Sequence, residues 1–319
     1  MKAVVYTKYG GPEVLQLQEI AKPVPKDDEV LVKVYAVSLN DWDLGLLKGD
    51  FVNRIMHGIF APKKNILGSD IAGVVETVGR HVKKFQPGDE VYGDLSGKWG
   101  GMAEWVCARE KSLALKPASM SFIQAAAIPQ AAMLAIQGLI DVGKIHQDQK
   151  ILINGGGGGV GTFGVQIAKL YNAVVTGVDS TEKLEMMRSI GFDHVIDYKK
   201  EDFTKNGESY DLILDAKTNR SVFDYTHVLF PGAVYATVGG SSSRLLQILF
   251  LAPWIWRRRK KHMRIVILKT NKDLVFVNEI FEAGKFKPVI DGPYTLENAQ
   301  DAFRHFISGE HKGKIVITI

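Results

Sequence analysis

The sequence of 319 residues predicts an α/β protein with two kinds of sheet, a doubly wound parallel sheet and an irregular, mostly antiparallel β domain. Three observations predict this fold class. Residues 1–120 hold short apolar and β-branched runs separated by Gly and Pro, with little helical periodicity. From residue 121 strands and helices alternate, which is typical of a parallel sheet covered on both faces. A glycine run at residues 155–161 lies between one such strand and a helix.

The individual elements follow from apolar runs and their periodicity. In the first part we expect strands at residues 29–37, 73–78 and 90–92. In the second part we expect strands at residues 150–154, 173–178, 194–198, 210–215, 232–238 and 263–269, and helices at 121–138, 158–171 and 181–190. Pro129 should break the first of these helices. The tail returns to short strands around a helix near 296–307. The expected domains are therefore 1–120 with 285–319, and 121–284.

Composition narrows the classes of function. Hydrophobic residues make up 46% of the chain, as in a soluble globular protein, and a net charge of +5 does not indicate a nucleic-acid partner. The single cysteine, Cys107, cannot form an internal disulfide or a cysteine-rich zinc site. No apolar run is long enough for a signal peptide or a membrane span. We therefore expect a cytoplasmic protein.

The glycine run predicts a dinucleotide site. Gly156, Gly158 and Gly161 match the pattern G-x-G-x-x-G, and Gly155, Gly158 and Gly161 match the alternative pattern small-x-x-Gly-x-x-Gly. Glycine lets the backbone turn sharply and approach a pyrophosphate, and the free N–H groups at the start of a helix attract that anion. A flexible loop without a ligand is disfavoured because a strand precedes the run and a helix follows it.

Asp179 extends this prediction to the cofactor. It ends the next predicted strand, and a dinucleotide fold places an acidic residue there, about 20 residues on, to bind the ribose hydroxyls. Its charge would repel a 2′-phosphate and so favours NADH, whereas Ser180, Thr181 and Lys183 nearby could accommodate NADPH. The cofactor is therefore expected to be NADPH or NADH. A helix N-cap remains the alternative role for Asp179.

Several motifs in order along the whole chain carry a family resemblance. They are Ser-Leu-Asn at 38–40, Gly-Ser-Asp-Ile-Ala-Gly-Val-Val at 68–75, Pro-Gly-Asp-Glu-Val at 87–91, Gly-Met-Ala-Glu at 101–104, the strand and glycine run at 153–161, and Gly-Lys-Ile-Val at 313–316. With these motifs the sequence resembles the medium-chain dehydrogenase/reductase superfamily, in its zinc-free quinone oxidoreductase branch. The resemblance implies a GroES-like catalytic β domain, a Rossmann domain and a cofactor bound between them.

The resemblance also implies roles for single residues. Asn40 would lie near the nicotinamide, Tyr198 near the adenosine end, and the backbone of residues 237–241 beside the nicotinamide ring. The full set of expected cofactor-binding residues is Gly155, Gly157, Gly158, Gly159, Val160, Gly161, Asp179, Lys183, Tyr198, Val238 and Gly239. The chain departs from the family pattern at Gly156 and Gly157, where Ala and Ser are common, and at Leu134, where Thr is common. The loop is therefore expected to bind phosphate through its backbone alone.

The zinc ligands of related enzymes are missing, because residues 38–41 hold no cysteine and residues 68–70 read Gly-Ser-Asp. We therefore expect no metal. Without a Lewis acid, a quinone or an enone is an easier hydride acceptor than a simple ketone. The candidate catalytic residues are Asn40, Ser69 and Asp70, and no proton donor can be named. A turn residue for Asn40 and a structural carboxylate for Asp70 remain open.

Three further expectations remain open. Trp42, Phe51 and His57 could line an apolar substrate pocket or belong to ordinary core and loops. Residues 245–261, an apolar run followed by five basic residues, could form a lid or homodimer contact, a peripheral foot on the inner membrane face, or a charged surface loop. The rival functions are a metal-free alcohol or aldehyde dehydrogenase and a non-catalytic nucleotide-binding redox sensor.

Overall fold

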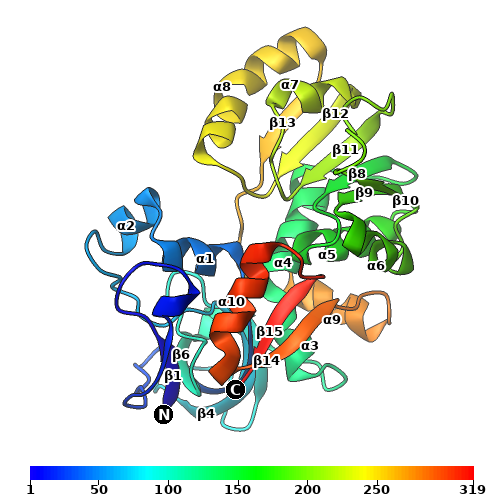
Figure 1. Ribbon diagram of the computed structural model, residues 1–319. Helices are drawn as coiled ribbons and strands as arrows, with labels where there is room; N and C mark the ends of the chain where they lie inside the picture. The colour runs from blue at the N-terminus through cyan, green and yellow to red at the C-terminus, as the bar shows by residue number, and fades with distance from the viewer. The chain divides into compact units, whose positions relative to one another are not determined.

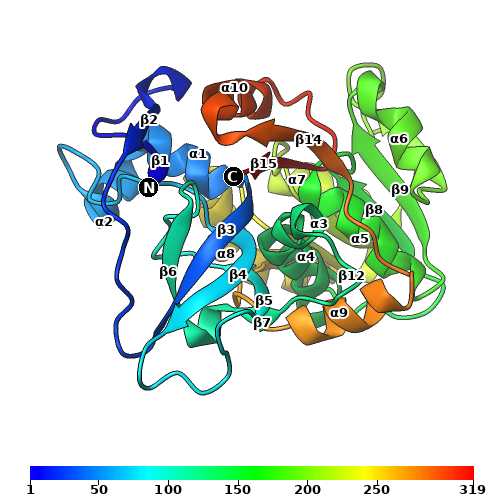
Figure 2. The ribbon, with the colours of Figure 1, turned by 90° about the horizontal axis from the view of Figure 1, so that it is seen from below.

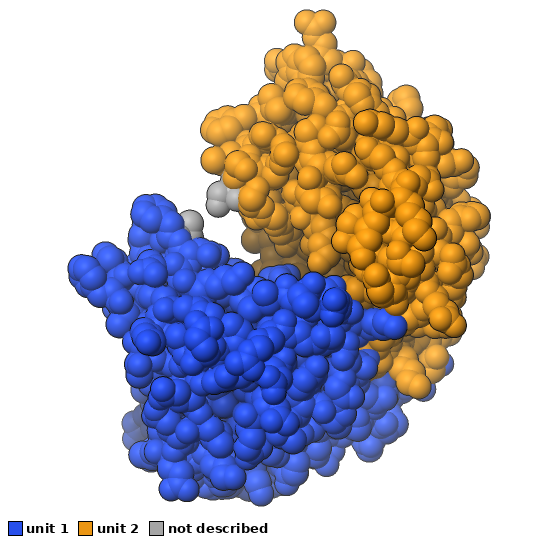
Figure 3. Space-filling model, viewed as in Figure 1, with its two compact units in different colours: residues 1–130, 270–283, 290–319 blue, residues 131–269, 284–289 orange. Residues whose placement is uncertain are grey.

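The structure is a computed structural model that describes residues 1–319 apart from the side chains of Val52 and Ser242. Contacts between residues divide the chain into two compact units, coloured separately in Figure 3. Unit 1 holds residues 1–130, 270–283 and 290–319, and unit 2 holds residues 131–269 and 284–289. The contacts therefore group residues 121–130 and 270–283 with unit 1, although the sequence suggested limits after residue 120 and before residue 285. The N-terminal and C-terminal segments lie in the same unit.

Unit 1 is built on a seven-stranded sheet with the order β14-β15-β3-β4-β5-β7, in which β6 also pairs with β3. The pairs are antiparallel except β14 with β15. A separate pair, β1 with β2, completes the strands. Their bounds are β1 Lys2–Val5, β2 Gln16–Glu19, β3 Glu29–Ser38, β4 Asp70–Val78, β5 Glu90–Asp94, β6 Trp105–Arg109, β7 Ala114–Leu115, β14 Ile290–Thr295 and β15 Lys314–Thr318.

The strand register of unit 1 gathers polar residues at one end of the sheet. Ser38 lies opposite Asp70, and Asp70 lies opposite Asp94 on the next strand. Further along the same strands, apolar side chains from β3, β4, β5 and β15 form one continuous core. The sheet therefore holds a group of buried polar side chains next to its apolar core.

The α-helices of unit 1 are α1 (Asp41–Lys48), α2 (Phe51–His57), α3 (Phe122–Ala127), α9 (Leu274–Glu282) and α10 (Ala299–Ser308). α10 lies beside β14 and β15 in both ribbon views (Figures 1 and 2). α1 and α2 lie within residues 1–120, where the sequence shows little helical periodicity. They have eight and seven residues, too few turns for a clear apolar period in the sequence.

Unit 2 contains a six-stranded parallel sheet with the order β10-β9-β8-β11-β12-β13. Its strands are β8 Lys150–Asn154, β9 Val174–Asp179, β10 His194–Asp197, β11 Tyr210–Asp215, β12 Leu229–Thr237 and β13 His262–Ile265. The order starts at β8 and runs outward in both directions, so the direction of winding reverses between β8 and β11. This is the doubly wound Rossmann topology, in which ligands bind at the carboxyl ends of the strands beside that reversal. The predicted fold class is confirmed.

The helices of unit 2 are α4 (Pro129–Ile136, whose first two residues are grouped with unit 1), α5 (Gly159–Lys169), α6 (Leu184–Ser189), α7 (Val222–His227) and α8 (Ser242–Arg259). The expected break at Pro129 separates α3 from α4. α7 and α8 pack on the face of the sheet that carries Leu152 and Ile213. α5 packs on the opposite face, where Gly164 lies against Ile153. Among the described residues, no helix is both long and apolar enough to cross a bilayer.

Candidate functional site

The glycine loop joins β8 to α5 and is tied to the neighbouring strand. The N–H groups of Gly155 and Gly156 both donate to the carbonyl oxygen of Val178, at 2.9 and 3.0 Å. Gly155 has a φ of +88°, a conformation that residues with a Cβ rarely adopt. The helix begins at Gly159, so the N–H groups of its first turn have no acceptor within the helix and face outward from its N-terminus.

The loop is packed too tightly for side chains at two of its glycines. A Cβ on Gly161 would lie 2.3 Å from the carbonyl oxygen of Gly155 and 2.6 Å from that of Gly156. A Cβ on Gly157 would lie 2.7 Å from Cδ of Lys183. The departure from the family pattern at Gly157 therefore has a physical reason, because the buried Lys183 side chain takes the space that a serine would need.

Asp179 ends β9 beside this loop, as the sequence predicts. Its carboxylate accepts hydrogen bonds from the N–H groups of Gly157 and Ser180, both at 2.9 Å, and Lys183 Nζ lies 3.6 Å away. Asp179 and Lys183 are 5% and 1% exposed, so they form a buried ion pair against the loop. Ser180, and not Asp179, is the N-cap of the following turn. The N–H of Tyr198 donates to the carbonyl oxygen of Asp179 at 3.2 Å, and the Tyr198 side chain is largely exposed.

The segment after β12 meets the end of β11 at the same edge of the sheet. The N–H of Val238 donates to the carbonyl oxygen of Asp215 at 3.1 Å, and Thr218 Oγ1 donates to the carbonyl oxygen of Gly239 at 2.6 Å. The buried Asp215 carboxylate in turn accepts a hydrogen bond from Asn154 at 2.9 Å. This polar network fixes the backbone of residues 237–241 next to the end of β8.

Unit 2 thus brings the expected cofactor residues of the glycine loop, of β9 and β10, and of residues 237–241 to the carboxyl ends of its parallel strands. That edge is where doubly wound sheets bind dinucleotides. The free N–H groups, the tightly packed glycines and the acidic residue after the second strand fit the diphosphate and ribose of a nicotinamide dinucleotide. The binding role of each residue stays a prediction.

Unit 1 contains a second polar centre, which joins the three candidate catalytic residues. Asn40 Nδ2 donates to Ser69 Oγ at 3.2 Å. Lys314 Nζ donates to Asn40 Oδ1 at 2.6 Å and to the carbonyl oxygen of Leu39 at 2.7 Å, and it lies 3.7 Å from Asp70 Oδ2. Asn40 is 6% exposed, Lys314 is 4% exposed, and Ser69 and Asp70 are fully buried. Sequence reasoning missed Lys314, although a lysine that opens an apolar strand was a possible signal.

Asp43 is a further buried carboxylate in unit 1. It accepts hydrogen bonds from the N–H groups of Asn40, at 3.0 Å, and Gly68, at 2.9 Å, and so fixes the start of α1 against the segment that precedes β4. Burial raises the pKa of Asp43 to about 6, and burial raises the pKa of Asp70 to about 7 against the opposing charge of Lys314. Burial lowers the pKa of Lys314 from its usual value.

The three residues proposed to line a substrate pocket do not share one environment. Trp42 and His57 both contact the ring of the buried Trp99, with ring centroids 6.2 and 5.2 Å apart, respectively. Phe51 is 80% exposed at the start of α2, and other exposed apolar side chains follow it on α2 and beyond. The exposed residues in this run are Ile55, Met56, Ile59 and Phe60. A substrate pocket here stays a prediction.

Comparison with known proteins decides the family. Residues 26–118 match the alcohol dehydrogenase GroES-like domain, and residues 190–317 match a family described as zinc-binding dehydrogenase. The chain is 36% identical to 2-methylene-furan-3-one reductase of Solanum lycopersicum, an alignment that covers 99% of this chain and 79% of that protein. The chain is a medium-chain dehydrogenase/reductase. The resemblance predicted from the motifs is confirmed.

Two other relatives of this medium-chain dehydrogenase/reductase agree with that assignment. NADPH-dependent alkenal/one oxidoreductase of Arabidopsis thaliana is 35% identical over 99% of this chain and 79% of that protein. The solved structure of the quinone oxidoreductase from Coxiella burnetii superposes with a TM-score of 0.87 at 25% identity, covering 100% of this chain and 99% of that one.

One matched family is described as zinc-binding, so the question is whether this medium-chain dehydrogenase/reductase has side chains that could bind a zinc ion. Among the side chains that the structure describes, no three His, Cys, Asp or Glu groups are placed to hold a metal ion. The buried carboxyls of Asp43, Asp70 and Asp94 offer oxygen alone and share the charge of Lys314, whereas zinc sites typically include histidine nitrogen or cysteine sulfur among their ligands. Zinc independence stays a prediction.

The raised pKa of Asp70 predicts an unusual dependence of stability on pH for this medium-chain dehydrogenase/reductase. Because burial raises its pKa to about 7 in the folded state, the folded protein holds a proton that the unfolded chain loses near pH 4. The free energy of unfolding should therefore fall as the pH rises from 4 to 7, by up to about 1.4 kcal/mol per pH unit from this group. Urea unfolding across this range measures the slope.

The Asp70→Asn variant is the control for that slope. It removes the titrating group and leaves Asp43, Asp94 and Lys314, so its unfolding free energy should change less steeply between pH 4 and 7. Parallel slopes for the variant and the original protein would show that Asp70 does not titrate in this range.

Proposed function

We propose that the chain transfers hydride from NAD(P)H to an enone or a quinone without the help of a metal ion. The observation that carries this proposal is the glycine loop and its neighbours, which fit a nicotinamide dinucleotide at the carboxyl edge of a doubly wound sheet. The relatives support the acceptor, since they are named for a methylene-furanone, alkenals and alkenones, and quinones.

The proposed reaction consumes one NAD(P)H and one proton. With an enone, hydride adds to the carbon β to the carbonyl, the C=C double bond becomes single, and the α carbon takes the proton. With a quinone, the same two electrons and two protons in total give the hydroquinone. Conjugation spreads the negative charge that develops during hydride addition, so these acceptors need less polarisation than a simple ketone.

Asn40 is the group that we propose to donate a hydrogen bond to the substrate oxygen. Lys314 occupies its Oδ1 atom, which turns the amide nitrogen toward Ser69. Lys314 therefore acts as a positioning residue, because a flipped amide would set the Asn40 nitrogen against the Lys314 ammonium. A donor held in place before reaction stabilises developing charge without the cost of reorganisation.

We also propose that the exposed apolar side chains of α1 and α2 contact the apolar part of the substrate. Trp42 and Phe51 are 54% and 80% exposed, and His57 lies against Trp99 close by. Large aromatic surfaces of this kind are rare on a soluble protein unless they bind something.

For the cofactor, we propose that NADH is accepted at least as well as NADPH. The carboxylate of Asp179 would repel a 2′-phosphate, while Lys183 Nζ, 3.6 Å away, offsets part of that charge. A strong preference for NADPH in dissociation constants measured side by side would contradict this role for Asp179.

The assay that tests the function follows NAD(P)H absorbance with an alkenal, an alkenone and a naphthoquinone. We expect turnover with at least one of them after treatment of the protein with a chelator. The saturated aldehyde of equal length is the matched control and should react far more slowly. Faster turnover of saturated aldehydes or alcohols would instead support an alcohol dehydrogenase, and nucleotide binding without any turnover would support a redox sensor.

A further inference from the structure

Residues 225–272, which belong to unit 2 as far as Lys269, have a charge unlike the rest of the chain. This segment contains nine of the chain's 40 Lys and Arg residues and none of its 35 Asp and Glu residues. The remainder therefore carries 31 basic against 35 acidic residues, so the whole positive excess of the protein comes from this segment. Five of the nine form one run, Arg257 to Lys261, at the end of α8.

α8 is apolar on two opposite faces. Its inner face packs on the sheet of unit 2 through Ile248 and Ile255, which are 2% and 0% exposed. Its outer face carries a second apolar stripe at helical spacing, in which every member is exposed: Leu246, Leu249, Phe250, Pro253 and Trp254. Leu249 is 62% exposed and Phe250 78%. The ring of Trp254 contacts that of Phe223 on α7, but most of the stripe is left exposed, whereas a surface helix normally has a polar outer face.

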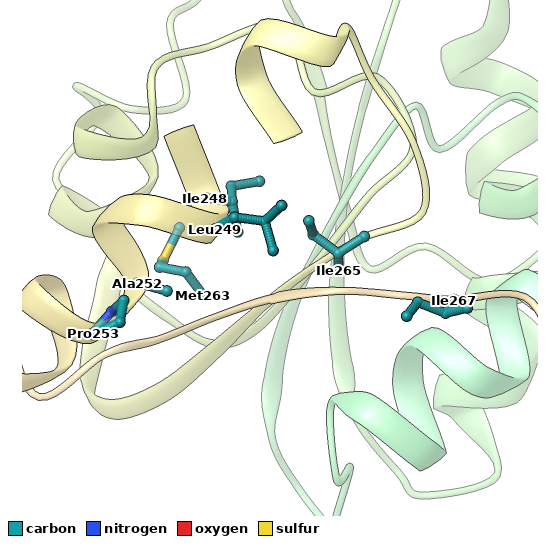
Figure 4. A pocket seen from close by; sticks show the side chains of 7 residues that line it. All are labelled: Ile248, Leu249, Ala252, Pro253, Met263, Ile265 and Ile267. Atoms are coloured by element: carbon teal, nitrogen blue, oxygen red, sulfur yellow. The ribbon is translucent and has the colours of Figure 1, made fainter. Parts of the chain in front are cut away.

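The stripe continues into an apolar groove between α8 and the last strand of the sheet. Figure 4 shows side chains from both elements facing the same space, which has a volume of about 420 Å³. The residues that line it all have apolar side chains: Ile248, Leu249, Ala252, Pro253, Met263, Ile265 and Ile267. Ile267 is 81% exposed at the far rim. The exposed apolar surface therefore extends from the helix to the edge of the sheet.

The basic run lies next to this surface and is only partly used within the fold. Arg259 Nη1 donates to Thr226 Oγ1 at 2.6 Å, and Lys261 Nζ donates to the carbonyl oxygen of Thr226, so both are anchored to α7. Arg257 and Arg258 are exposed, and among the described side chains neither has a hydrogen bond or ion pair. At helical spacing Arg257 lies on the same face as Phe250 and Trp254.

From this arrangement we propose that the outer face of α8 binds an anionic lipid surface. Leucine and aromatic side chains flanked by arginines are what an interfacial helix uses, with the apolar groups at the acyl boundary and the cations at the headgroups. Charge complementarity favours an anionic lipid surface over a second copy of the chain as the partner of this face. A two-fold contact centred on α8 would bring two acid-free segments together with no countercharge. The inference is independent of the proposed redox activity, because its test measures binding to vesicles.

Flotation of the full chain with vesicles tests the proposal. We expect it to float with phosphatidylcholine vesicles that contain phosphatidylglycerol, to stay unbound with phosphatidylcholine alone, and to bind less at higher salt. Arg257→Gln/Arg258→Gln should weaken binding about fivefold per charge removed, the equivalent of about 1 kcal/mol per basic residue near an anionic surface. Leu249→Ser/Phe250→Ser should also weaken it.

Two variants with matched changes elsewhere are the controls. Lys83→Gln/Lys84→Gln removes the same charge from exposed positions of unit 1, and Val24→Ser removes a side chain that is 85% exposed. Both should bind vesicles like the original protein. Equal loss in the controls, no flotation at low salt, binding to RNA but not to vesicles, or a dimer that depends on Phe250 without vesicle binding would each overturn the proposal.

Discussion

Replacing Gly161 with alanine should weaken the binding of NADH and NADPH roughly a hundredfold, about 3 kcal/mol, the upper end of the cost of overpacking. The added Cβ would lie 2.3 Å from the carbonyl oxygen of Gly155, and that atom belongs to the backbone. The loop must therefore open, which moves the N–H groups of the first turn of α5 away from the diphosphate. Titration of the nicotinamide fluorescence measures the dissociation constants.

Gly164→Ala is the matched control, one turn further along α5. Its Cβ would lie 3.1 Å from the ends of Ile153 and Leu214, which are flexible side chains that can shift. We expect unchanged cofactor binding and a small change in stability. If Gly161→Ala bound NADPH as tightly as Gly164→Ala, the loop would not be the diphosphate site.

Replacing Lys314 with methionine should lower the free energy of unfolding by about 3–5 kcal/mol, the usual result of removing one partner from a buried ion pair. Lys314 is 4% exposed and supplies hydrogen bonds to Asn40 and Leu39 as well as charge near Asp70. Without it, the oxygens of Leu39 and Asn40 lose this donor, and the buried Asp70 carboxylate, which still accepts from the N–H of Gln130, loses its countercharge. Urea unfolding at about pH 8, above the pKa of Asp70, measures the loss with the carboxyl ionised.

Two further variants separate this effect from the loss of any lysine. Lys312→Met changes an exposed lysine two residues earlier and should leave stability nearly unchanged. Lys314→Met/Asp70→Asn removes both charges and should be more stable than Lys314→Met alone. A cost for Lys314→Met no larger than that for Lys312→Met would contradict the ion pair.

The cofactor half of the site was predictable because its signals are local. The strand, the glycine run and the helix follow one another in the sequence, and Asp179 ends the next strand, so spacing alone placed them at one edge. What the sequence did not disclose is how Asp179 is used there. Its buried pair with Lys183 and the resulting lack of space at Gly157 depend on packing between β9 and the loop.

The polar centre of unit 1 was less predictable because distant segments build it. Asn40 and Lys314 are 274 positions apart and meet only because β15 pairs with β3. Lysine is usually exposed, so composition gives no hint that this one is buried. α8 was the reverse case. Its composition allowed three interpretations, and the structure adds which of its residues form an inner face and which an outer one.

The most direct test of the central claim is the fate of the nicotinamide hydrogen. The protein would be given an alkenone and NADPH deuterated at C4, with each stereoisomer in turn, and the product examined by NMR. The account predicts that one of the two isomers places a single deuterium on the carbon β to the carbonyl. Saturated product without label from either isomer, or no product at all, would contradict direct hydride transfer.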